Sequence, residues 1–261
     1  MLAVERQRRI LDLVNEQGSV RVTEISERFD VTPETVRRDL DLLESDRKLQ
    51  RSHGGAVRLE DGHGDIPYLE RESMNSREKS EVALAALKYI QPGDRIALDA
   101  SSTAWYLARA LPDIALTVLT NSVRVVVELS GKERIDVIST GGILRPTSMS
   151  FVGPLAEDAL GKYHVNKAFL SCKGIHAVHG ASESNELQAL IKRRMVSIAD
   201  KVFLLTDHTK FGIRDFAHAV DVHDLDIIIT DTKVDAEVVS AFHDLGIEVV
   251  NKSNEEKSSD E

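Results

Sequence analysis

Arginine and small polar residues follow one another in the segment from Ser19 to Gly55, and their types suit contact with DNA. Thr35, Arg37 and Arg38 fall near the start of a predicted helix. Arginine forms bidentate hydrogen bonds with guanine or phosphate, and threonine hydrogen-bonds to bases or phosphate. A short helix that carries such residues at its N-terminal end can enter the major groove. The predicted DNA-contacting residues are Thr32, Glu34, Thr35, Arg37, Arg38, Arg51, Ser52, His53 and Gly54.

Two short helices, a tight turn and a β-hairpin wing are the elements expected to position these side chains. Thr32 is placed to cap the second helix, and Pro33 takes its first position, where the missing N–H costs nothing. Gly54-Gly55 permits the tight turn of the wing. A small helical dimerisation module would show a similar pattern, but the cap, the arginine pair and the wing together favour DNA binding. The residues with the i, i+4, i+7 spacing of an inward helix face are Val36, Leu40 and Leu43.

A second group of polar residues follows the predicted strands of the C-terminal part of the chain. Hydroxyls and free N–H groups at a helix N-terminus bind anions, and glycine lets a ligand approach the backbone closely. Ordinary helix caps or a solvated lysine would also explain each position taken alone. Because ligands of open α/β sheets bind beyond the C-terminal strand ends, several such loops together favour a phosphorylated small molecule. The residues are Asp99, Ser101, Ser102, Thr103, Asn121, Ser122, Gly141, Gly142 and Lys210.

The elements that must position this second group alternate between strand and helix. From Asp94 onward, short apolar segments such as RIALDA, LTVLT and IDVIST are separated by helical segments such as TAWYLARAL. This alternation predicts an α/β domain with a mostly parallel sheet. We therefore predict a winged helix–turn–helix domain at 1–59, a linker at 60–75, an α/β effector domain at 76–251 and a disordered tail at 252–261.

Composition limits the location and the partners of the chain. No apolar run approaches the ~18 residues of a membrane span, and the charged N-terminus is unlike a secretory signal. Cys172 is the single cysteine, which excludes an internal disulfide and fits a cytoplasmic protein. Residues 1–59 carry 11 Lys and Arg against 11 Asp and Glu, so the net charge of −10 falls entirely on the rest of the chain. DNA contact must therefore be local to the N-terminal arginines and lysines.

The segments TPETVRRDLDLLE and LQRSHGGAV closely resemble the N-terminal signature of the DeoR family of bacterial sugar-metabolism regulators. LDASSTAWYLA, TNS, TGG, FVGPLAE, NKAFLSCKGI and TDHTKFG resemble its effector domain, whose fold is like that of ribose-5-phosphate isomerase. The resemblance implies a repressor that leaves its operator when a phosphorylated sugar binds. It implies sugar-phosphate binding at Ser101, Ser102, Thr103, Asn121, Gly141, Gly142 and Lys210. The family commonly has glycine where this chain has Ser101.

The related isomerases suggest an enzyme as the alternative. They use paired aspartates, then Lys-Gly and a glutamate base. Here the corresponding residues are Asn166, Lys167, Lys173-Gly174 and Glu183. Because asparagine cannot act as the required carboxylate, we expect no catalysis, with Lys173 and Glu183 lining the effector pocket as binding groups.

The sequence also bears on the oligomeric state, the effector and the metal content of the chain. One helix–turn–helix covers a half-site of double-stranded DNA, so a homodimer or tetramer is expected. The segments ASSTAWYLA and HVNKAFLSCKG look most like regulators of rhamnose-type deoxysugar pathways. A regulator that senses a partner protein is a third hypothesis. His176 and His179 lie three residues apart, but no third ligand is evident, so neither a metal nor a cofactor is expected.

Overall fold

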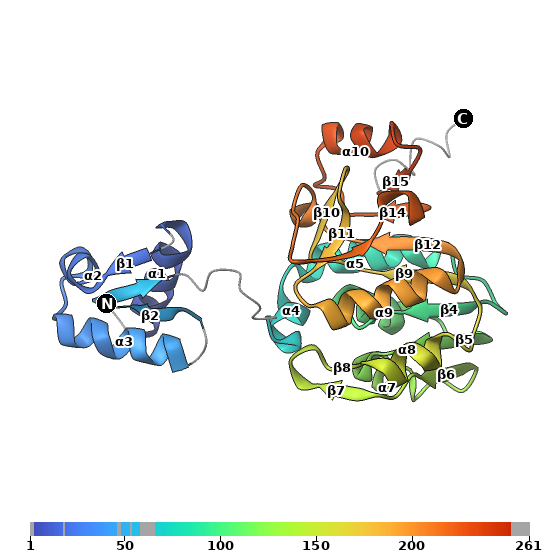
Figure 1. Cartoon of the computed structure of the whole chain (residues 1–261), viewed down its shortest axis with the longest axis horizontal. Helices are drawn as coiled ribbons and strands as arrows, with labels where there is room; N and C mark the ends of the chain where they lie inside the picture. The colour runs from blue at the N-terminus through green and yellow to red at the C-terminus, as the bar shows by residue number, and fades with distance from the viewer. Residues whose placement is uncertain (1–2, 18, 46–47, 53, 58–65, 252–261) are drawn as a thin grey trace. The chain divides into compact units, whose positions relative to one another are not determined.

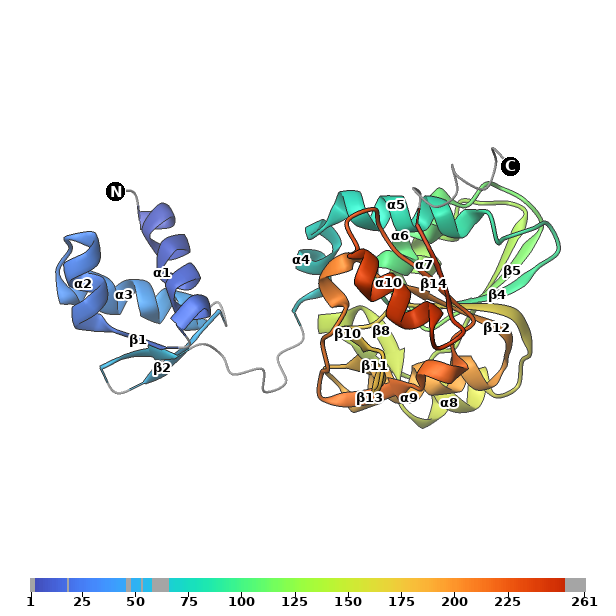
Figure 2. The same cartoon turned by 90° about the horizontal axis from the view of Figure 1, so that it is seen from above.

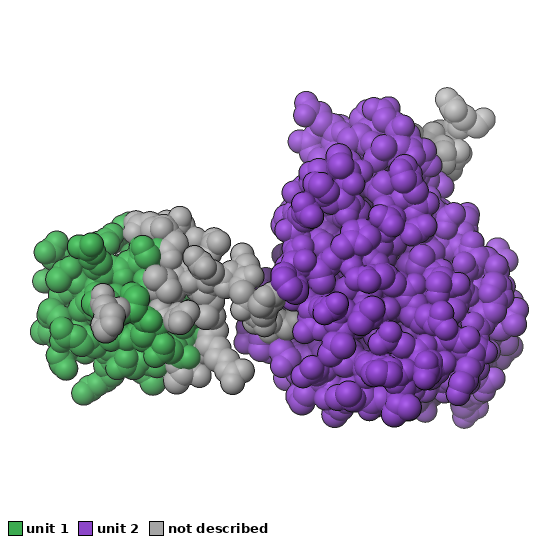
Figure 3. All heavy atoms as spheres, viewed as in Figure 1, with its two compact units in different colours: residues 1–64 green, residues 65–261 purple. Residues whose placement is uncertain are grey.

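The computed structural model describes residues 3–17, 19–45, 48–52, 54–57 and 66–251. The chain divides into two compact units, residues 1–64 and 65–261, which are coloured separately in Figure 3. The tail predicted at 252–261 and His53 of the predicted wing lie outside the described residues.

The first unit is a winged helix–turn–helix. Three antiparallel strands in the order β1-β3-β2 pack with three helices, as Figure 1 shows. The core is formed by the inward faces of all three helices, including Ile10 of the first, Ile25 of the second and Leu40 of the third. The elements are α1 (Ala3–Gln17), β1 (Ser19–Arg21), α2 (Val22–Phe29), α3 (Pro33–Ser45), β2 (Gln50–Ser52) and β3 (Gly55–Val57).

The wing approaches the start of the helix–turn–helix closely at Gly55. A Cβ atom at this position would lie 2.1 Å from the carbonyl oxygen of Val20, so no other residue fits without moving the backbone. Strand β3 pairs with β1 on this side, and the N–H of Val22 donates to the carbonyl oxygen of Gly54 at 2.9 Å. The Gly-Gly pair is therefore needed both for the turn and for this contact.

The second unit is a three-layer α/β domain built on a parallel sheet of seven strands in the order β15-β14-β12-β9-β4-β5-β6. Every pairing between neighbouring strands of this sheet is parallel. The strands are β4 (Arg95–Leu98), β5 (Leu116–Thr120), β6 (Ile135–Ser139), β9 (Val165–Leu170), β12 (Ala199–Leu205), β14 (Ile227–Ile229) and β15 (Glu248–Val250). The predicted α/β class and parallel sheet are confirmed.

Helices cover both faces of this sheet, as Figure 2 shows from above. One core cluster joins the sheet to α5, α6 and α7, and the other joins it to α8, α9 and α10. The helices are α4 (Tyr68–Ser73), α5 (Ser76–Leu87), α6 (Ser102–Ala110), α7 (Val123–Leu129), α8 (Pro154–Leu160), α9 (Glu186–Ser197) and α10 (Ala236–His243).

Smaller elements lie in the segments between the strands of the main sheet. The hairpin of β7 (Ile143–Arg145) and β8 (Ser150–Val152) encloses the 3-10 turn η1 (Pro146–Ser148). A second small sheet has the order β10-β11-β13, formed by Gly174–His176, Gly180–Glu183 and Ala217–Val220. Two further 3-10 turns, η2 (His208–Lys210) and η3 (Val222–Asp224), follow β12 and β13. Within the described ranges, no helix has the length and apolar composition that crossing a bilayer demands.

The predicted linker at 60–75 extends too far. Residues 68–73 form α4, and the side chain of Tyr68 is fully buried in the core of the second unit. The sequence of this segment resembles a polar linker because so short a helix buries only one large side chain, that of Tyr68.

Candidate DNA-binding surface and effector pocket

The recognition helix α3 begins as the sequence predicts. Asp30 adopts a left-handed conformation (φ 52°) that ends α2, and the N–H of Thr35 donates to the Thr32 hydroxyl at 3.3 Å. Val36 and Leu40 are fully buried, which leaves Arg38 on the exposed side of the helix. The cap prediction at Thr32 is therefore confirmed.

The arginines of this surface differ in their present partners. Arg37 is paired with Glu34 at 2.8 Å, and Arg51 with Asp41 at 3.1 Å. Arg38 forms no hydrogen bond or ion pair with any described residue, so its guanidinium is available to an external partner. Arg51 of β2 thus joins the wing to α3 through Asp41, and its side chain also donates to the carbonyl oxygen of Gly55 in β3 at 3.3 Å.

A buried ion pair that the sequence analysis missed fixes α1 against α3. Arg6 donates to the Asp39 carboxylate at 2.6 Å, and Gln7 donates to it at 3.0 Å. Arg6 and Asp39 are both buried, whereas Glu34, Arg37 and Arg38 of α3 are exposed. The remaining predicted residues Ser52 and Gly54 lie in the wing, where both are exposed.

The pocket of the second unit lies where the strand order reverses. From β4 the chain proceeds to β5 on one side, and from β9 it proceeds to β12 on the other. The loops after β4, β9 and β12 therefore diverge and leave a crevice at their C-terminal ends, the usual ligand position in such sheets. They supply Ser101, Ser102 and Thr103, then Ser171, Cys172 and Lys173, then Asp207 and Lys210.

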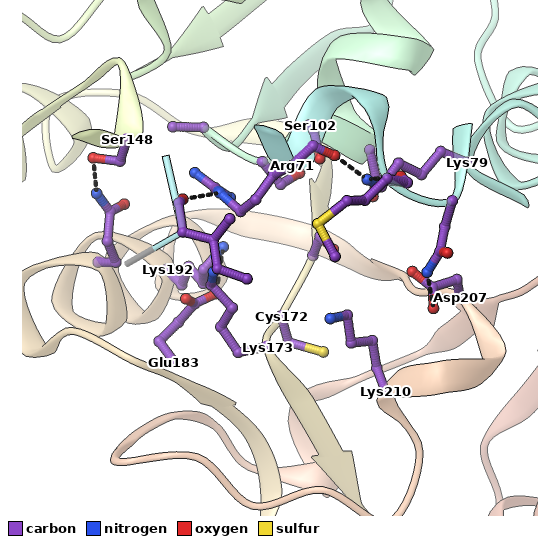
Figure 4. A pocket seen from close by; sticks show the side chains of 18 residues that line it. Arg71, Lys79, Ser102, Ser148, Cys172, Lys173, Glu183, Lys192, Asp207 and Lys210 are labelled. Atoms are coloured by element: carbon purple, nitrogen blue, oxygen red, sulfur yellow. Dashed lines mark hydrogen bonds and ion pairs between the residues drawn. The ribbon is translucent and has the colours of Figure 1, made fainter. Parts of the chain in front are cut away.

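Basic side chains dominate the charge of this pocket. Five cationic residues and two carboxylates line it, a local excess of positive charge within an acidic domain. In Figure 4, Arg71 and Lys79 lie above the cavity, and Lys173 and Lys210 lie below it. The ammonium group of Lys210 has no hydrogen-bond partner in the described part of the chain. The cationic lining residues are Arg71, Lys79, Lys173, Lys192 and Lys210, and the carboxylates are Glu183 and Asp207.

A cluster of buried charged residues lies at one wall of the pocket. Lys192 on α9 donates to the Asp99 carboxylate and lies 3.2 Å from that of Glu183. Burial opposes its charged form, but the two carboxylates outweigh this and raise the pKa of Lys192. Burial raises the pKa of Glu183, against the lowering effect of Lys192 and Lys173. Asp99 also accepts from the N–H groups of Ser101 and Ser171, so it positions two pocket loops.

The start of α6 leaves donors for an anion. Ser101 caps the helix, and its hydroxyl accepts from the N–H of Ala104 at 3.0 Å. Its φ of −78° is ordinary for any residue, so the glycine common in the family is not required here. The N–H groups of Ser102 and Thr103 have no intrahelical acceptor, and their buried side chains line the pocket. Burial raises the pKa of the neighbouring Cys172 thiol to about 12, so the thiol stays protonated.

Five of the predicted effector residues do not line this pocket. Asp99 is 1% exposed and lies behind the lining, where it positions two pocket loops, and the other four follow strands β5 and β6. Asn121 and Ser122 follow β5, whereas Gly141 and Gly142 follow β6, on the side of the sheet away from β9. Ser122 caps α7, and the Asn121 amide donates to the carbonyl oxygen of Phe151 at 2.9 Å. A Cβ atom at Gly142 would lie 2.9 Å from the Val152 carbonyl oxygen, which explains the glycine by packing. The structure brings together Ser101, Ser102, Thr103, Lys173, Glu183 and Lys210.

Other expected or alternative sites have structural explanations. The rings of His176 and His179 are 4.8 Å apart, and no group of three potential metal ligands occurs in the described part of the chain. Trp105 is buried in the core, and its indole N–H donates to Glu128 at 2.9 Å. Asn166 accepts from the N–H of Arg95 at 2.9 Å, a structural contact at the start of β4.

Comparison with known proteins identifies the class that this geometry defines. The DeoR-like helix-turn-helix domain matches residues 6–61, and the DeoR C terminal sensor domain matches residues 74–232. The chain is 52% identical to the uncharacterized HTH-type transcriptional regulator YulB of Bacillus subtilis over 249 residues, which cover 95% of this chain and 96% of that protein. It belongs to the DeoR family of transcriptional regulators.

More distant relatives connect the family with sugar operons. The chain is 37% identical to the L-fucose operon activator of Haemophilus influenzae, covering 87% of this chain and 91% of that protein. It is 33% identical to the putative aga operon transcriptional repressor of Escherichia coli O157:H7, covering 94% and 93%. A ribose 5-phosphate isomerase A from Methanocaldococcus jannaschii aligns with a TM-score of 0.40 and 18% identity, covering 52% of this chain and 55% of that one. Its family membership makes the chain a DNA-binding transcriptional regulator with a sensor domain and not an enzyme.

Proposed function

We propose that this regulator represses a sugar-catabolic operon in the cytoplasm and leaves its operator when a phosphorylated sugar binds the pocket of the second unit. The observation that supports this most directly is the excess of cations in the pocket beside the free N–H groups of α6. A phosphate dianion satisfies both features, because it accepts several hydrogen bonds and carries two charges. A neutral sugar leaves the cations of the pocket uncompensated.

The rest of the pocket suits the sugar. Asp207 offers a carboxylate to sugar hydroxyls, whereas Ile66, Met74 and Cys172 give the lining an apolar part. An apolar contact suits the C6 methyl group of a deoxysugar, in agreement with the fucose operon of one relative and with the rhamnose-type resemblance. Relatives include both an activator and a repressor, so the direction of regulation rests on the resemblance to the family.

DNA is proposed to bind through the exposed side of α3 and the wing. Arg38 is the first candidate for base or phosphate contact, because no described residue competes for it. Thr32, Glu34, Thr35 and Arg37 are proposed to line the same surface, with Arg51, Ser52, His53 and Gly54 assisting from the wing. One such unit reads a half-site, so we propose that a homodimer or tetramer binds the full operator.

Replacing Ser102 with aspartate tests the phosphate site. Ser102→Asp places a fixed negative charge at the first turn of α6, where an acidic residue is compatible with a helix. Like charges about 4 Å apart repel by about 4 kcal/mol at an effective dielectric constant near 20, so sugar-phosphate affinity should fall by roughly 1000-fold. Ser102→Asn has almost the same size without the charge and should lose far less.

The assay is release of an operator fragment, selected from random DNA by the wild-type chain, as sugar phosphates are added. Ser102→Asp should bind the fragment normally and resist release. Release at the wild-type sugar-phosphate concentration would contradict the phosphate assignment and leave the DNA assignment standing. If no phosphorylated sugar affects wild-type binding, but a protein from the same cell does, the effector is a partner protein.

A further inference from the structure

Helix α4 occupies a special position in the second unit. It is the first helix of this unit and follows directly in sequence on residues 58–65, which connect it to the DNA-binding unit. The same short segment contributes Ile66, Arg71, Met74 and Asn75 to the wall of the pocket. A ligand in the pocket therefore contacts the part of the domain that is nearest in sequence to the DNA-binding unit.

Two pocket cations are tied to the backbone of this segment. The ammonium group of Lys79 on α5 donates to the carbonyl oxygens of Arg71 and Met74, the latter at 2.5 Å. The Arg71 guanidinium donates through Nε to the carbonyl oxygen of Ile66 at 3.0 Å. These contacts occupy only part of the donor capacity, because an ammonium group has three N–H bonds and a guanidinium has five. Both side chains keep donors for a ligand.

The surroundings of Lys79 favour an anion. Burial lowers the pKa of Lys79 to about 8, and Lys210, Arg71 and Lys173 act in the same direction. The charge of Asp207 opposes this shift, and its carboxylate also accepts from the Asn75 amide at 3.4 Å. An anion placed among these cations would relieve their mutual repulsion.

On its opposite side, α4 contacts the domain both through satisfied hydrogen bonds and through buried polar atoms that lack a partner among the described residues. Glu72 forms a two-oxygen ion pair with Arg124 at 3.1 and 2.9 Å, and its carbonyl oxygen accepts from the Tyr106 hydroxyl at 3.2 Å. However, the buried hydroxyl of Tyr68 and the buried Nε of Arg124 find no partner among the described residues. Unpaired buried polar groups cost free energy, so this side of α4 is less stably packed than its burial suggests.

We propose that Arg71 and Lys79 form a second anion-binding arm of the effector pocket, and that effector binding is transmitted to the DNA-binding unit through α4. This inference rests on the proposed function, and it adds the residues and the helix that report the ligand. The anion draws Arg71 and Lys79 together with Lys210 of η2, which stabilises residues 66–75 against the strand ends. Sugar-phosphate binding and operator binding are thereby coupled through one helix.

Hydrogen exchange of the full chain tests this, with inorganic phosphate as the probe. In the wild type, saturating phosphate should slow amide exchange of a peptide covering residues 66–75. Arg71→Met should weaken phosphate binding about 10- to 150-fold, as expected for loss of a hydrogen bond to a charged group, and should abolish this protection. Arg71→Lys keeps the charge and should restore part of both effects.

Arg77→Met is the matched control. It removes the same charge from the neighbouring helix α5, where the side chain is 84% exposed and, among the described residues, forms its ion pair with Glu81. It should behave like the wild type in both measurements. Trp105 fluorescence checks that each variant keeps the fold of the second unit, because Trp105 is the single tryptophan and is buried there.

The outcomes separate this inference from the proposed function. If the wild type binds neither phosphate nor any sugar phosphate, the pocket assignment itself is wrong. If it binds phosphate without a change in exchange at residues 66–75, or if Arg71→Met binds as the wild type does, the α4 inference is wrong and the pocket assignment stands. Protection that is lost in Arg71→Met and kept in Arg77→Met supports the inference.

Discussion

Removal of the Lys192 ammonium group should destabilise the second unit strongly. Lys192 is 5% exposed and contacts the carboxylates of Asp99, 1% exposed, and Glu183, 6% exposed. Lys192→Met keeps most of the aliphatic volume but leaves two buried carboxylates without their shared cation. Breaking a buried ion pair by removing one partner costs about 3–5 kcal/mol, and here one lysine serves two partners. We expect the free energy of unfolding to fall by about that amount at pH 7.5.

The loss should depend on pH in a defined direction. Burial raises the pKa of Glu183, and Lys192 counteracts this rise. Without Lys192, the folded-state pKa of Glu183 is therefore higher still. A carboxyl group whose folded pKa exceeds its unfolded value of about 4.3 contributes stability at low pH and loses it as the pH rises through the folded pKa. The difference between wild type and Lys192→Met should consequently shrink from pH 7.5 to pH 5.

Urea unfolding followed by Trp105 fluorescence measures this quantity for the second unit alone, because the first unit contains no tryptophan. Lys162→Met, at an exposed lysine after α8, is the matched control and should change stability little. Lys192→Met combined with Glu183→Gln should recover part of the loss at pH 7.5, since only Asp99 then stays unpaired. A loss below about 1 kcal/mol, as for surface ion pairs, would refute the buried cluster.

Three further predictions concern the two binding surfaces. Arg38→Ala should weaken operator binding by about 1–3 kcal/mol if Arg38 contacts a base, or lower the salt slope by about 1 if it contacts a phosphate; unchanged titrations at low and high salt would remove it from the surface. Gly55→Ala, whose Cβ atom would lie 2.1 Å from the Val20 carbonyl oxygen, should destabilise the first unit by about 1–3 kcal/mol or more, seen as a circular dichroism transition that Trp105 does not follow. Burial lowers the pKa of Lys79 to about 8, so Lys79 loses most of its charge between pH 7 and pH 9; calorimetry should show that the phosphate affinity of the wild type, relative to that of Lys79→Met at the same pH, falls roughly tenfold over this range.

Local patterns were sufficient for the elements and for part of the sites. The cap at Thr32 and the apolar spacing of α3 depend only on neighbours within two helical turns, so the recognition helix was predictable. The loops after β4, β9 and β12 were predictable as strand ends for the same reason. Strand order was not, because it depends on contacts distant in sequence. Asn121 and Gly142 also follow strands, yet their strands lie on the far side of the switch point.

Pocket residues that lie on helices were harder to predict from the sequence than those in the loops after strands. Lys192 lies in a helical segment rich in basic residues, where nothing local separates it from the exposed Arg193 and Arg194. Only its burial against Asp99 and Glu183 shows its role. Arg71 belongs to a segment that resembles a linker by composition. Its position follows from the burial of Tyr68, a single contact that a periodic pattern cannot reveal.

The distribution of charge lets one chain distinguish two kinds of anion. Residues 60–261 hold the entire net charge of −10, whereas five cationic side chains line the pocket of the second unit. At physiological ionic strength, exposed charges are screened beyond about 8 Å, so both the repulsion of DNA and the attraction of a small anion act only close to the protein surface. DNA therefore meets a domain with no net charge at residues 1–59, and a sugar phosphate meets a cationic crevice. On the proposed function, the excess of acidic residues in the second unit disfavours DNA near its surface, and the cationic lining of the crevice favours a small anion.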